Sequence, residues 1–333
     1  MSTSSTEPRR VTIHDVARSA GVSRQTVSRA LNDKAEIDGS TKQRVLDAAR
    51  ELGYRPSRFA RGLVRPDTTT IGLVVPDLLN PFFTEVASGA LEAARARGWH
   101  VVVHDTTDDP EQELATLRVI GTQVDAVVGY FSRSDEDLDR LTAGIPVVLI
   151  GREPRLPRFS GIGIDGEDGV REAVAHLVSR GHRRIGMLDG HPAPSVRQRW
   201  FRRAAAECGI AVHPGWIAGA AQTVDGGGAA LATLLAAHPD VTAVFAFNDV
   251  MAIGALREAR RFGLRVPADL AVIGFDGLAL GTLVEPELSS VAVDTRALGA
   301  LAVEQAARLV TGAAPLEPGE LIIHAGLHLR ESA

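Results

Sequence analysis

Cysteine is nearly absent from this sequence of 333 residues. The one cysteine, Cys208, excludes an internal disulfide framework and a cysteine-rich metal site, and we assign it to simple packing. Long apolar runs are also missing: none approaches the roughly 18 residues that a membrane span requires. The first ten residues, MSTSSTEPRR, contain no apolar core of a signal peptide. We therefore expect a cytoplasmic protein that does not contact a membrane.

Catalytic and metal-binding motifs are missing as well. No H-E-x-x-H pair occurs, Ser195 lacks the G-x-S-x-G frame of a nucleophile elbow, and Gly226–Gly228 lacks the lysine of a phosphate loop. The run G161-I-G-I-D-G166 matches the dinucleotide fingerprint, and Asp189 follows at a suitable distance. That fingerprint needs a strand directly before its glycines, whereas residues 153–160 contain two prolines. We therefore expect no enzyme activity, no cofactor and no metal, and a nicotinamide-dependent enzyme remains an unfavoured alternative.

Charge is distributed unevenly along the chain. Residues 1–65 hold 13 Lys and Arg against 7 Asp and Glu, a balance of +6, while the remaining residues hold 23 against 34, a balance of −11. A small basic head on an acidic body indicates that only the head meets a polyanion.

The head begins with V11-T-I-H-D-V-A-R-S-A-G-V-S-R-Q-T-V-S-R-A-L-N32, which predicts two short helices separated by Gly21. Thr12 and Asp15 resemble a capping box for the first helix, and Ser23 is placed to cap the second. The apolar residues at helical spacing predict the buried faces; they are Val16, Ala17, Ala20, Val22, Val27 and Leu31.

The polar residues of the second predicted helix suit DNA recognition. Arg24 and Gln25 lie in its first turn, and Arg29 follows four residues after Gln25 on the same face. Arginine can bind guanine O6 and N7, and glutamine can bind adenine N6 and N7. Hydroxyl side chains suit phosphate oxygens, and here they are Ser23, Thr26 and Ser28. A solvated helix face that happens to carry arginines is the alternative.

A third helix is predicted from Ser40, where Gln43 would complete a capping box, through to Gly53. Its apolar positions are Val45, Leu46, Ala49 and Leu52. Three helices would form a compact module. A short basic segment, Y54-R-P-S-R-F-A-R-G-L-V-R-P66, follows.

These motifs resemble the lactose repressor and galactose repressor family of bacterial transcription regulators. Residues 11–32 are similar to that family's DNA-binding head, and S57-R-F-A-R-G-L63 is similar to its hinge segment. The resemblance implies that Arg24, Gln25 and Arg29 read bases and that Leu63 enters the minor groove, kinking it. It also implies contacts to the DNA backbone from Thr12, Ser23, Thr26, Ser28, Asn32, Tyr54 and Arg58.

The body alternates strand-like and helical patterns from residue 70 onward. Near-continuous apolar strands separated by helices imply parallel sheets covered on both faces, and a break near residues 152–161 suggests two lobes. The predicted strands are 70–75, 100–103, 125–128, 146–150, 184–188, 243–247 and 270–275. The family resemblance continues through N80-P-F-F83, 181–187, 247–249 and 272–276. It implies a small all-α helix-turn-helix head and a two-lobed α/β body like a type I periplasmic binding protein, with three crossings between lobes.

Ligands of such sheets bind beyond the carboxyl ends of the strands, where Asp77, Asp165, Asn248 and Asp276 are predicted to lie. Carboxylates and amides there suit vicinal hydroxyls, although each could equally be a helix cap or turn residue. The resemblance adds further effector-binding positions: Phe82, Asp168, Arg197 and Asp249. Trp200 replaces a frequent glycine of the family and Val293 a frequent glutamine; Trp200 could stack on a sugar ring, although we favour packing.

Together these features predict a DNA-binding transcription regulator, a homodimer on a palindromic operator. We expect a repressor of sugar-utilisation genes released by a small carbohydrate; a purine corepressor is the alternative. The rival from another class is an enzyme or solute receptor whose basic head only localises it. The expected division is a disordered tail (1–10), a DNA-binding domain (11–56), a hinge (57–69) and an effector-binding and dimerisation domain (70–333), with the helix at 82–95 as a candidate dimer surface.

Overall fold

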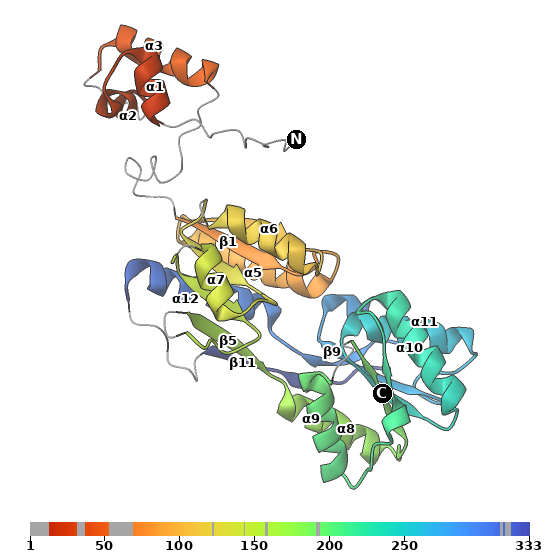
Figure 1. The fold of residues 1–333 in the computed structure, drawn as a ribbon. Coiled ribbons are helices and arrows are strands. Elements are labelled where there is room, and N and C mark those ends of the chain that lie inside the picture. Colours follow the sequence, from red (N-terminus) through yellow and green to blue (C-terminus); the bar gives the residue numbers. More distant parts are fainter. Residues whose placement is uncertain are drawn as a thin grey trace, which may run out of the picture. The chain divides into compact units, whose positions relative to one another are not determined.

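The chain forms two compact units, a head (Met1–Thr69) and a body (Thr70–Ala333), which are described separately. The structure is a computed structural model that describes residues 13–31, 37–52, 69–121, 123–142, 144–156, 159–190, 194–313, 316 and 321–333. Figure 1 shows the helical head and the two α/β lobes of the body. Apart from Thr69, the expected hinge lies outside the described residues.

Three helices pack around a small apolar core in the head: α1 (Ile13–Ala20), α2 (Arg24–Leu31) and α3 (Gly39–Glu51). Val16, Val27 and Val45, one from each helix, are fully buried, and alanines fill the space between them. Gly21 takes a φ of 65°, and a side chain there would meet no atom within 4 Å, so backbone freedom explains this glycine.

The predicted start of α3 is wrong. Asp38, rather than Ser40, caps the helix, because its carboxylate accepts hydrogen bonds from the Ser40 and Thr41 N–H groups at 3.1 and 3.2 Å. Gln43 donates to Asp47 at 3.1 Å instead of completing a capping box. Leu52, predicted to be buried, is 36% exposed.

The first lobe contains a six-stranded parallel sheet in the order β11-β5-β4-β3-β1-β2. The strands are β1 (Thr70–Val75), β2 (His100–Asp105), β3 (Ala126–Gly129), β4 (Val147–Ile150), β5 (Ser160–Asp165) and β11 (Ile322–His324). Helices α5 (Pro81–Ala96) and α12 (Thr295–Thr311) cover one face, and α6 (Pro110–Ile120) and α7 (Asp135–Thr142) cover the other. Every residue of β1 is buried, as expected for a parallel strand covered on both sides.

The second lobe repeats this arrangement in the order β12-β10-β9-β8-β6-β7, with only β12 antiparallel to its neighbour. The strands are β6 (Ile185–Asp189), β7 (Ile217–Gly219), β8 (Ala243–Ala246), β9 (Ala271–Asp276), β10 (Ser289–Ala292) and β12 (Gly326–His328). One face carries α8 (Glu167–Ser179) and α9 (Val196–Glu207); the other carries α10 (Val224–Ala237) and α11 (Asp249–Arg261). Short 3₁₀ turns occupy Pro214–Trp216 and Ala279–Thr282.

The chain passes between the lobes three times: from β5 to α8, from β10 to α12, and from β11 to β12. The predicted break near residues 152–161 is therefore misplaced, because β5 still belongs to the first lobe. A side chain at Gly161 would approach the Arg152 carbonyl to 2.7 Å, so glycine allows β5 to pass beneath the preceding loop. Gly161 and Gly163 lie within this strand, which removes them from the role of a dinucleotide-binding turn.

Candidate functional site

The exposed face of α2 carries the side chains predicted to read bases. Ser23 caps this helix: its hydroxyl oxygen accepts a hydrogen bond from the Thr26 N–H at 3.1 Å. Val27 and Ala30 anchor the opposite face in the core. The exposed residues of the helix are Arg24, Gln25 and Arg29. The head therefore exposes two guanidinium groups and one amide on one capped helix, and these groups are chemically suited to base edges.

The remaining predicted DNA contacts divide into two groups. Thr26 and Ser28 are half-buried on α2, beside the positions predicted to read bases. The others lie outside the described residues, and they are Thr12, Asn32, Tyr54, Arg58 and Leu63.

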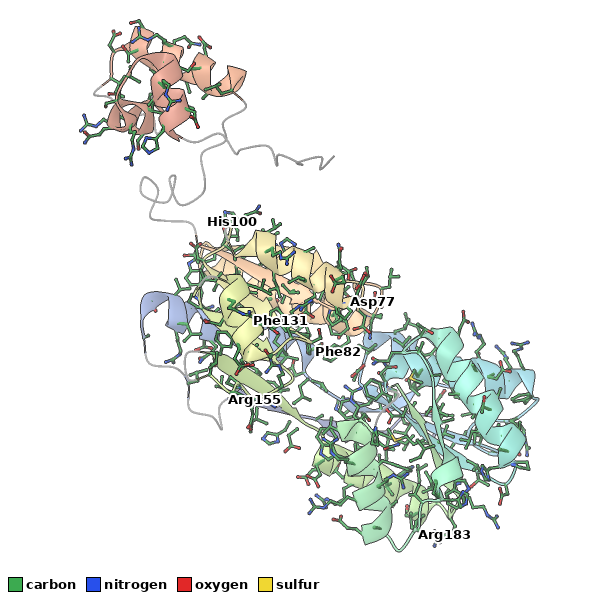
Figure 2. The ribbon with its side chains drawn as sticks, in the orientation of Figure 1. Asp77, Phe82, His100, Phe131, Arg155 and Arg183 are labelled. Carbon is green, nitrogen blue, oxygen red and sulfur yellow. The ribbon has the colours of Figure 1, made fainter. Side chains whose placement is uncertain are left out.

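Between the two lobes of the body lies a cleft of about 950 Å³. Its lining comes from the carboxyl ends of both sheets, with Asp77 following β1 and Asp276 ending β9. Figure 2 shows Asp77, Phe82 and Phe131 in the first lobe. This position matches the rule that ligands of parallel sheets bind beyond the strand ends. We call it the inter-lobe cleft.

Aromatic rings form much of the cleft wall. Phe82 and Phe83 pack edge-on against Tyr130 in the first lobe, with ring centroids 6.3 and 5.2 Å from that of Tyr130. In the second lobe, Trp200 lies stacked 6.3 Å from Phe275. Trp200 therefore packs on Phe275, as favoured, and also lines the cleft, while its stacking on a sugar ring stays a prediction.

A buried ion pair is the central polar feature of the second lobe's wall. The Arg197 guanidinium donates to Asp276 Oδ1 at 3.0 Å, and it lies 3.8 Å from the Phe275 ring centroid and 4.4 Å from that of Phe247. Burial raises the pKa of Asp276 to about 6, although the neighbouring Arg197 charge opposes the rise. Asp276 also has a φ of 110°, a strained conformation for a residue other than glycine. Both side chains line the cleft.

Two further predicted residues serve as local caps while lining the cleft. Asn248 Oδ1 accepts from the Met251 N–H at 2.9 Å, capping α11, and Asp77 Oδ1 accepts from the Leu79 N–H at 2.8 Å. With the Asn248 oxygen bonded to the backbone, its amide NH2 is the group left to donate to a ligand.

Three of the predicted effector residues do not line the cleft. Asp249 is fully buried and accepts from the Ser290 hydroxyl at 2.6 Å and from the Leu278 N–H at 2.7 Å. Burial, and then the Asp276 charge, raise the pKa of Asp249 to about 7. Asp165 instead accepts from the Glu167 N–H at 3.1 Å.

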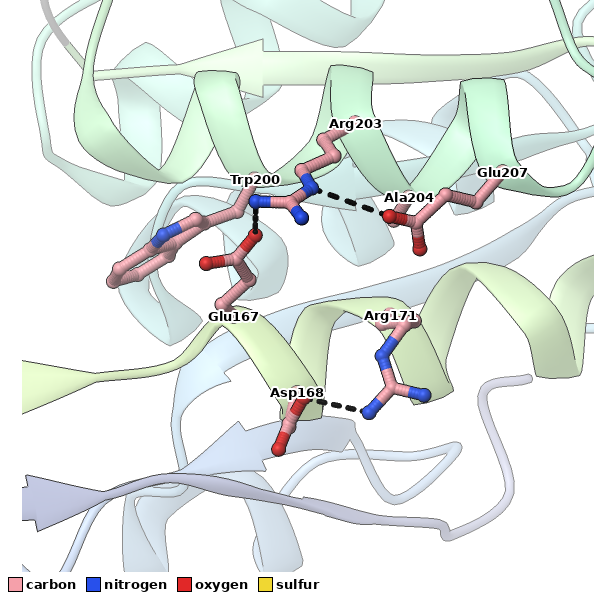
Figure 3. A pocket seen from close by; sticks show the side chains of 7 residues that line it. All are labelled: Glu167, Asp168, Arg171, Trp200, Arg203, Ala204 and Glu207. Atoms are coloured by element: carbon pink, nitrogen blue, oxygen red, sulfur yellow. Dashed lines mark hydrogen bonds and ion pairs between the residues drawn. The ribbon is translucent and has the colours of Figure 1, made fainter.

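Asp168 is the third of these residues, and it lies in a separate groove of about 320 Å³ between α8 and α9. Figure 3 shows it paired with Arg171 at 2.6 Å, while Arg203 bridges Glu167 and Glu207. Its side chain is 80% exposed. Because Arg171 lies three residues later on the same helix, the ion pair with it directs the Asp168 carboxylate along α8 and away from the inter-lobe cleft.

Sequence reasoning missed several cleft residues of the first lobe. Tyr130 and Ser132 follow β3, so their place after a predicted strand was a usable signal. Burial raises the pKa of Tyr130 well above its usual range, and the Asp276 charge adds to the rise. Glu113 lies in α6 and is 5% exposed; no sequence pattern marks it.

Comparison with known proteins identifies the family. Residues 12–57 match the model for bacterial regulatory proteins of the lacI family, and residues 174–333 match a periplasmic binding protein-like domain. The transcriptional regulator CelR of Thermobifida fusca is 35% identical over 337 residues, covering 97% of this chain and 98% of that protein. Catabolite control protein A of Priestia megaterium is 35% identical over 300 residues, covering 88% and 90%. The chain belongs to the lacI family.

Solved structures of this family agree with the fold. A complex of CelR with cellobiose matches with a TM-score of 0.71 and 32% identity, over 97% of this chain and 100% of that one. A regulator from Arthrobacter sp. FB24 in complex with lactose gives 0.73 and 34%, over 79% and 99%. The lac repressor dimer bound to operator and the anti-inducer ONPF gives 0.71 and 25%, over 97% and 99%.

These matches confirm the predicted fold class and the family resemblance. The present lacI-family chain is a DNA-binding transcriptional regulator with a periplasmic-binding-protein-like body, and it is not an enzyme. Among its described residues, no helix is long and apolar enough to cross a bilayer.

Proposed function

We propose that the protein is an effector-controlled repressor that binds a near-palindromic operator as a homodimer in the bacterial cytoplasm. The observation that carries the effector part is the inter-lobe cleft, where the Arg197–Asp276 pair is set among aromatic rings. The DNA part is supported by Arg24, Gln25 and Arg29, all exposed on a capped helix.

The cleft chemistry favours a small carbohydrate as effector. Asp276 can accept hydrogen bonds and the Asn248 amide can donate them, the combination that holds a pair of vicinal hydroxyls. Aromatic faces such as Phe82 suit the apolar face of a sugar ring. The cellobiose and lactose bound by two relatives support the same ligand class.

Dimerisation is proposed through the first lobe, around the outward side of α5. Leu79, just before this helix, is 90% exposed, and Leu91 on α5 and Val102 on β2 are each 40% exposed. Exposed large apolar side chains are typical of an interface when they adjoin one another, and the proposal requires these three to do so in the dimer. Two heads on a two-fold axis would then bind the two half-sites of a palindrome.

Effector binding would act on DNA through lobe closure. Three chain segments join the two lobes, so the lobes can close on a ligand by bending at these segments. Closure of the lobes would change the spacing of the two hinge segments across the dimer axis. An effector that lowers operator affinity must itself be bound more weakly in the operator complex, by the same factor.

The test is a titration of operator binding with free sugars and, separately, with purines. Release of DNA by a sugar supports the proposal. The stacked Trp200–Phe275 pair could also accept a purine base. Tighter DNA binding in the presence of a purine would therefore contradict release by a sugar and support a purine corepressor.

A further inference from the structure

The first lobe gives the inter-lobe cleft a second polar wall, made by α6 and by the segment that follows β3. Glu113 and Ser132 line the cleft at this place. The Ser132 hydroxyl donates to Glu113 Oε2 at 2.7 Å, and the Ser132 N–H donates to the same oxygen at 3.0 Å. The hydrogen of the serine hydroxyl is thereby committed to Glu113, so Ser132 Oγ can offer a ligand only its lone pairs.

Glu113 itself is unusual, because it is a buried carboxylate without a full set of partners. Its residue is 5% exposed, and its Oε1 has no hydrogen-bond partner among the described residues. The nearest cation, Arg133 Nε, lies 3.9 Å from Oε1, beyond hydrogen-bond distance. Burying a carboxylate costs free energy unless the carboxylate is paired and hydrogen-bonded. Here the hydrogen bonds of Glu113 Oε2 fix the orientation of Ser132.

The arginines of this wall are directed into the protein. Arg152 donates to Asp135 Oδ1 at 2.6 Å and to the Arg133 carbonyl at 3.0 Å. Arg133 donates to the Pro110 carbonyl at 2.6 Å. Among the described residues that line the cleft, five carboxylates face two guanidinium groups, and both of these arginines are engaged with carboxylates of the protein. The carboxylates are Asp77, Asp108, Asp109, Glu113 and Asp276.

The start of α6 also borders this wall, and the N-terminus of a helix would by itself favour an anion. Here that charge is already neutralised. Asp109 caps the helix by accepting from the Glu111 N–H at 2.9 Å, and Glu111 and Glu113 both lie in the first turn. A phosphate at this place would meet carboxylates.

We propose that this wall selects an uncharged effector that donates a hydroxyl hydrogen to Ser132 Oγ, and that it excludes phosphorylated sugars. Glu113 is a positioning residue, which acts by orienting Ser132. The inference rests on the proposed carbohydrate function and specifies the chemical class of the effector.

The experiment is isothermal titration calorimetry of the full-length protein with matched ligands. The probes are five free sugars (lactose, cellobiose, trehalose, sucrose, glucose) and the 6-phosphate of each. We expect each free sugar that binds to bind at least ten-fold more tightly than its phosphate. A phosphate that binds as tightly as its free sugar would overturn the inference while leaving the carbohydrate function intact. If neither kind of ligand binds, the proposed function fails and the inference with it.

Two variants separate positioning from stability. In Glu113→Ala the acceptor of the Ser132 hydroxyl is lost, so the hydroxyl hydrogen becomes free to donate to a phosphate oxygen, and we expect the ratio of free-sugar to phosphate affinity to fall at least five-fold. Glu111→Ala is the matched control, since it removes the same charge from the same helical turn at an exposed position outside the cleft lining. A merely structural role for Glu113 would change the thermal midpoint and leave the affinity ratio unchanged, and that result would refute the proposal.

Discussion

Replacing the buried carboxyl of Asp276 should change how the stability of the body depends on pH. Its pKa in the folded state is about 6, against the ordinary value of 3.8. Because the folded pKa is the higher one, folding is favoured while both states are protonated, and this advantage is lost as the pH rises from about 4 to about 6. The full shift corresponds to about 3 kcal/mol.

Asp276→Asn removes this titration, so the difference in unfolding free energy between wild type and variant cancels the carboxyl groups that do not interact with Asp276. The attraction between Arg197 and ionised Asp276 titrates with Asp276, and it is already included in the pKa of about 6. We expect the wild type to lose about 2 kcal/mol relative to the variant between about pH 4.5 and about pH 7.5. The change in the pKa of Asp249, which the Asp276 charge helps to raise, adds to this loss. Urea unfolding at several pH values measures it. A difference independent of pH, or one that grows in favour of the wild type, would refute the reasoning.

Three further predictions concern function and packing. Arg24→Ala should weaken operator binding by about 1–3 kcal/mol and relax one base position, measured by fluorescence anisotropy on operator variants; unchanged binding would count against the proposed role of α2. Asp276→Ala should abolish the effect of effector on operator binding while operator affinity without effector stays at the wild-type level. If the variant does not fold, Asp276 is instead required for the stability of the body. Gly299→Ala should destabilise the body by about 1–3 kcal/mol in urea unfolding, because the added carbon would lie 2.0 Å from the Val86 carbonyl oxygen on α5; wild-type stability would contradict this packing.

The long buried strands and the helices of the head could be predicted because apolar periodicity and local caps determine them. Val16 and Val27 are buried as their spacing predicts, and Ser23 caps α2. Three of the four edge strands could not: β7, β11 and β12 have three residues each, too few for a pattern, whereas the longer edge strand β2 was predicted. In β5, the alternating glycines match the sequence of a nucleotide-binding motif for another reason. Gly161 is needed there because the strand passes close to the Arg152 carbonyl.

The cleft was partly predictable for a related reason. The position of a carboxylate after a strand suggests that it lies near the cleft, but the direction of its side chain depends on tertiary contacts. Asp276 lines the cleft beside Arg197, whereas Asp249, directly after Asn248, turns inward to Ser290. Glu113 gave no signal, because its role depends on Ser132, nineteen residues away in sequence.

Selection from a random duplex DNA library at fixed, moderate salt tests the central claim most directly. The purified full-length protein is incubated with the library, and the retained DNA is sequenced in parallel for wild type and Arg24→Ala. The account predicts a palindrome with a central CG step for the wild type, and a relaxed position within each half-site for the variant. Retained DNA without any enriched sequence, with or without added sugars and purines, would contradict the account.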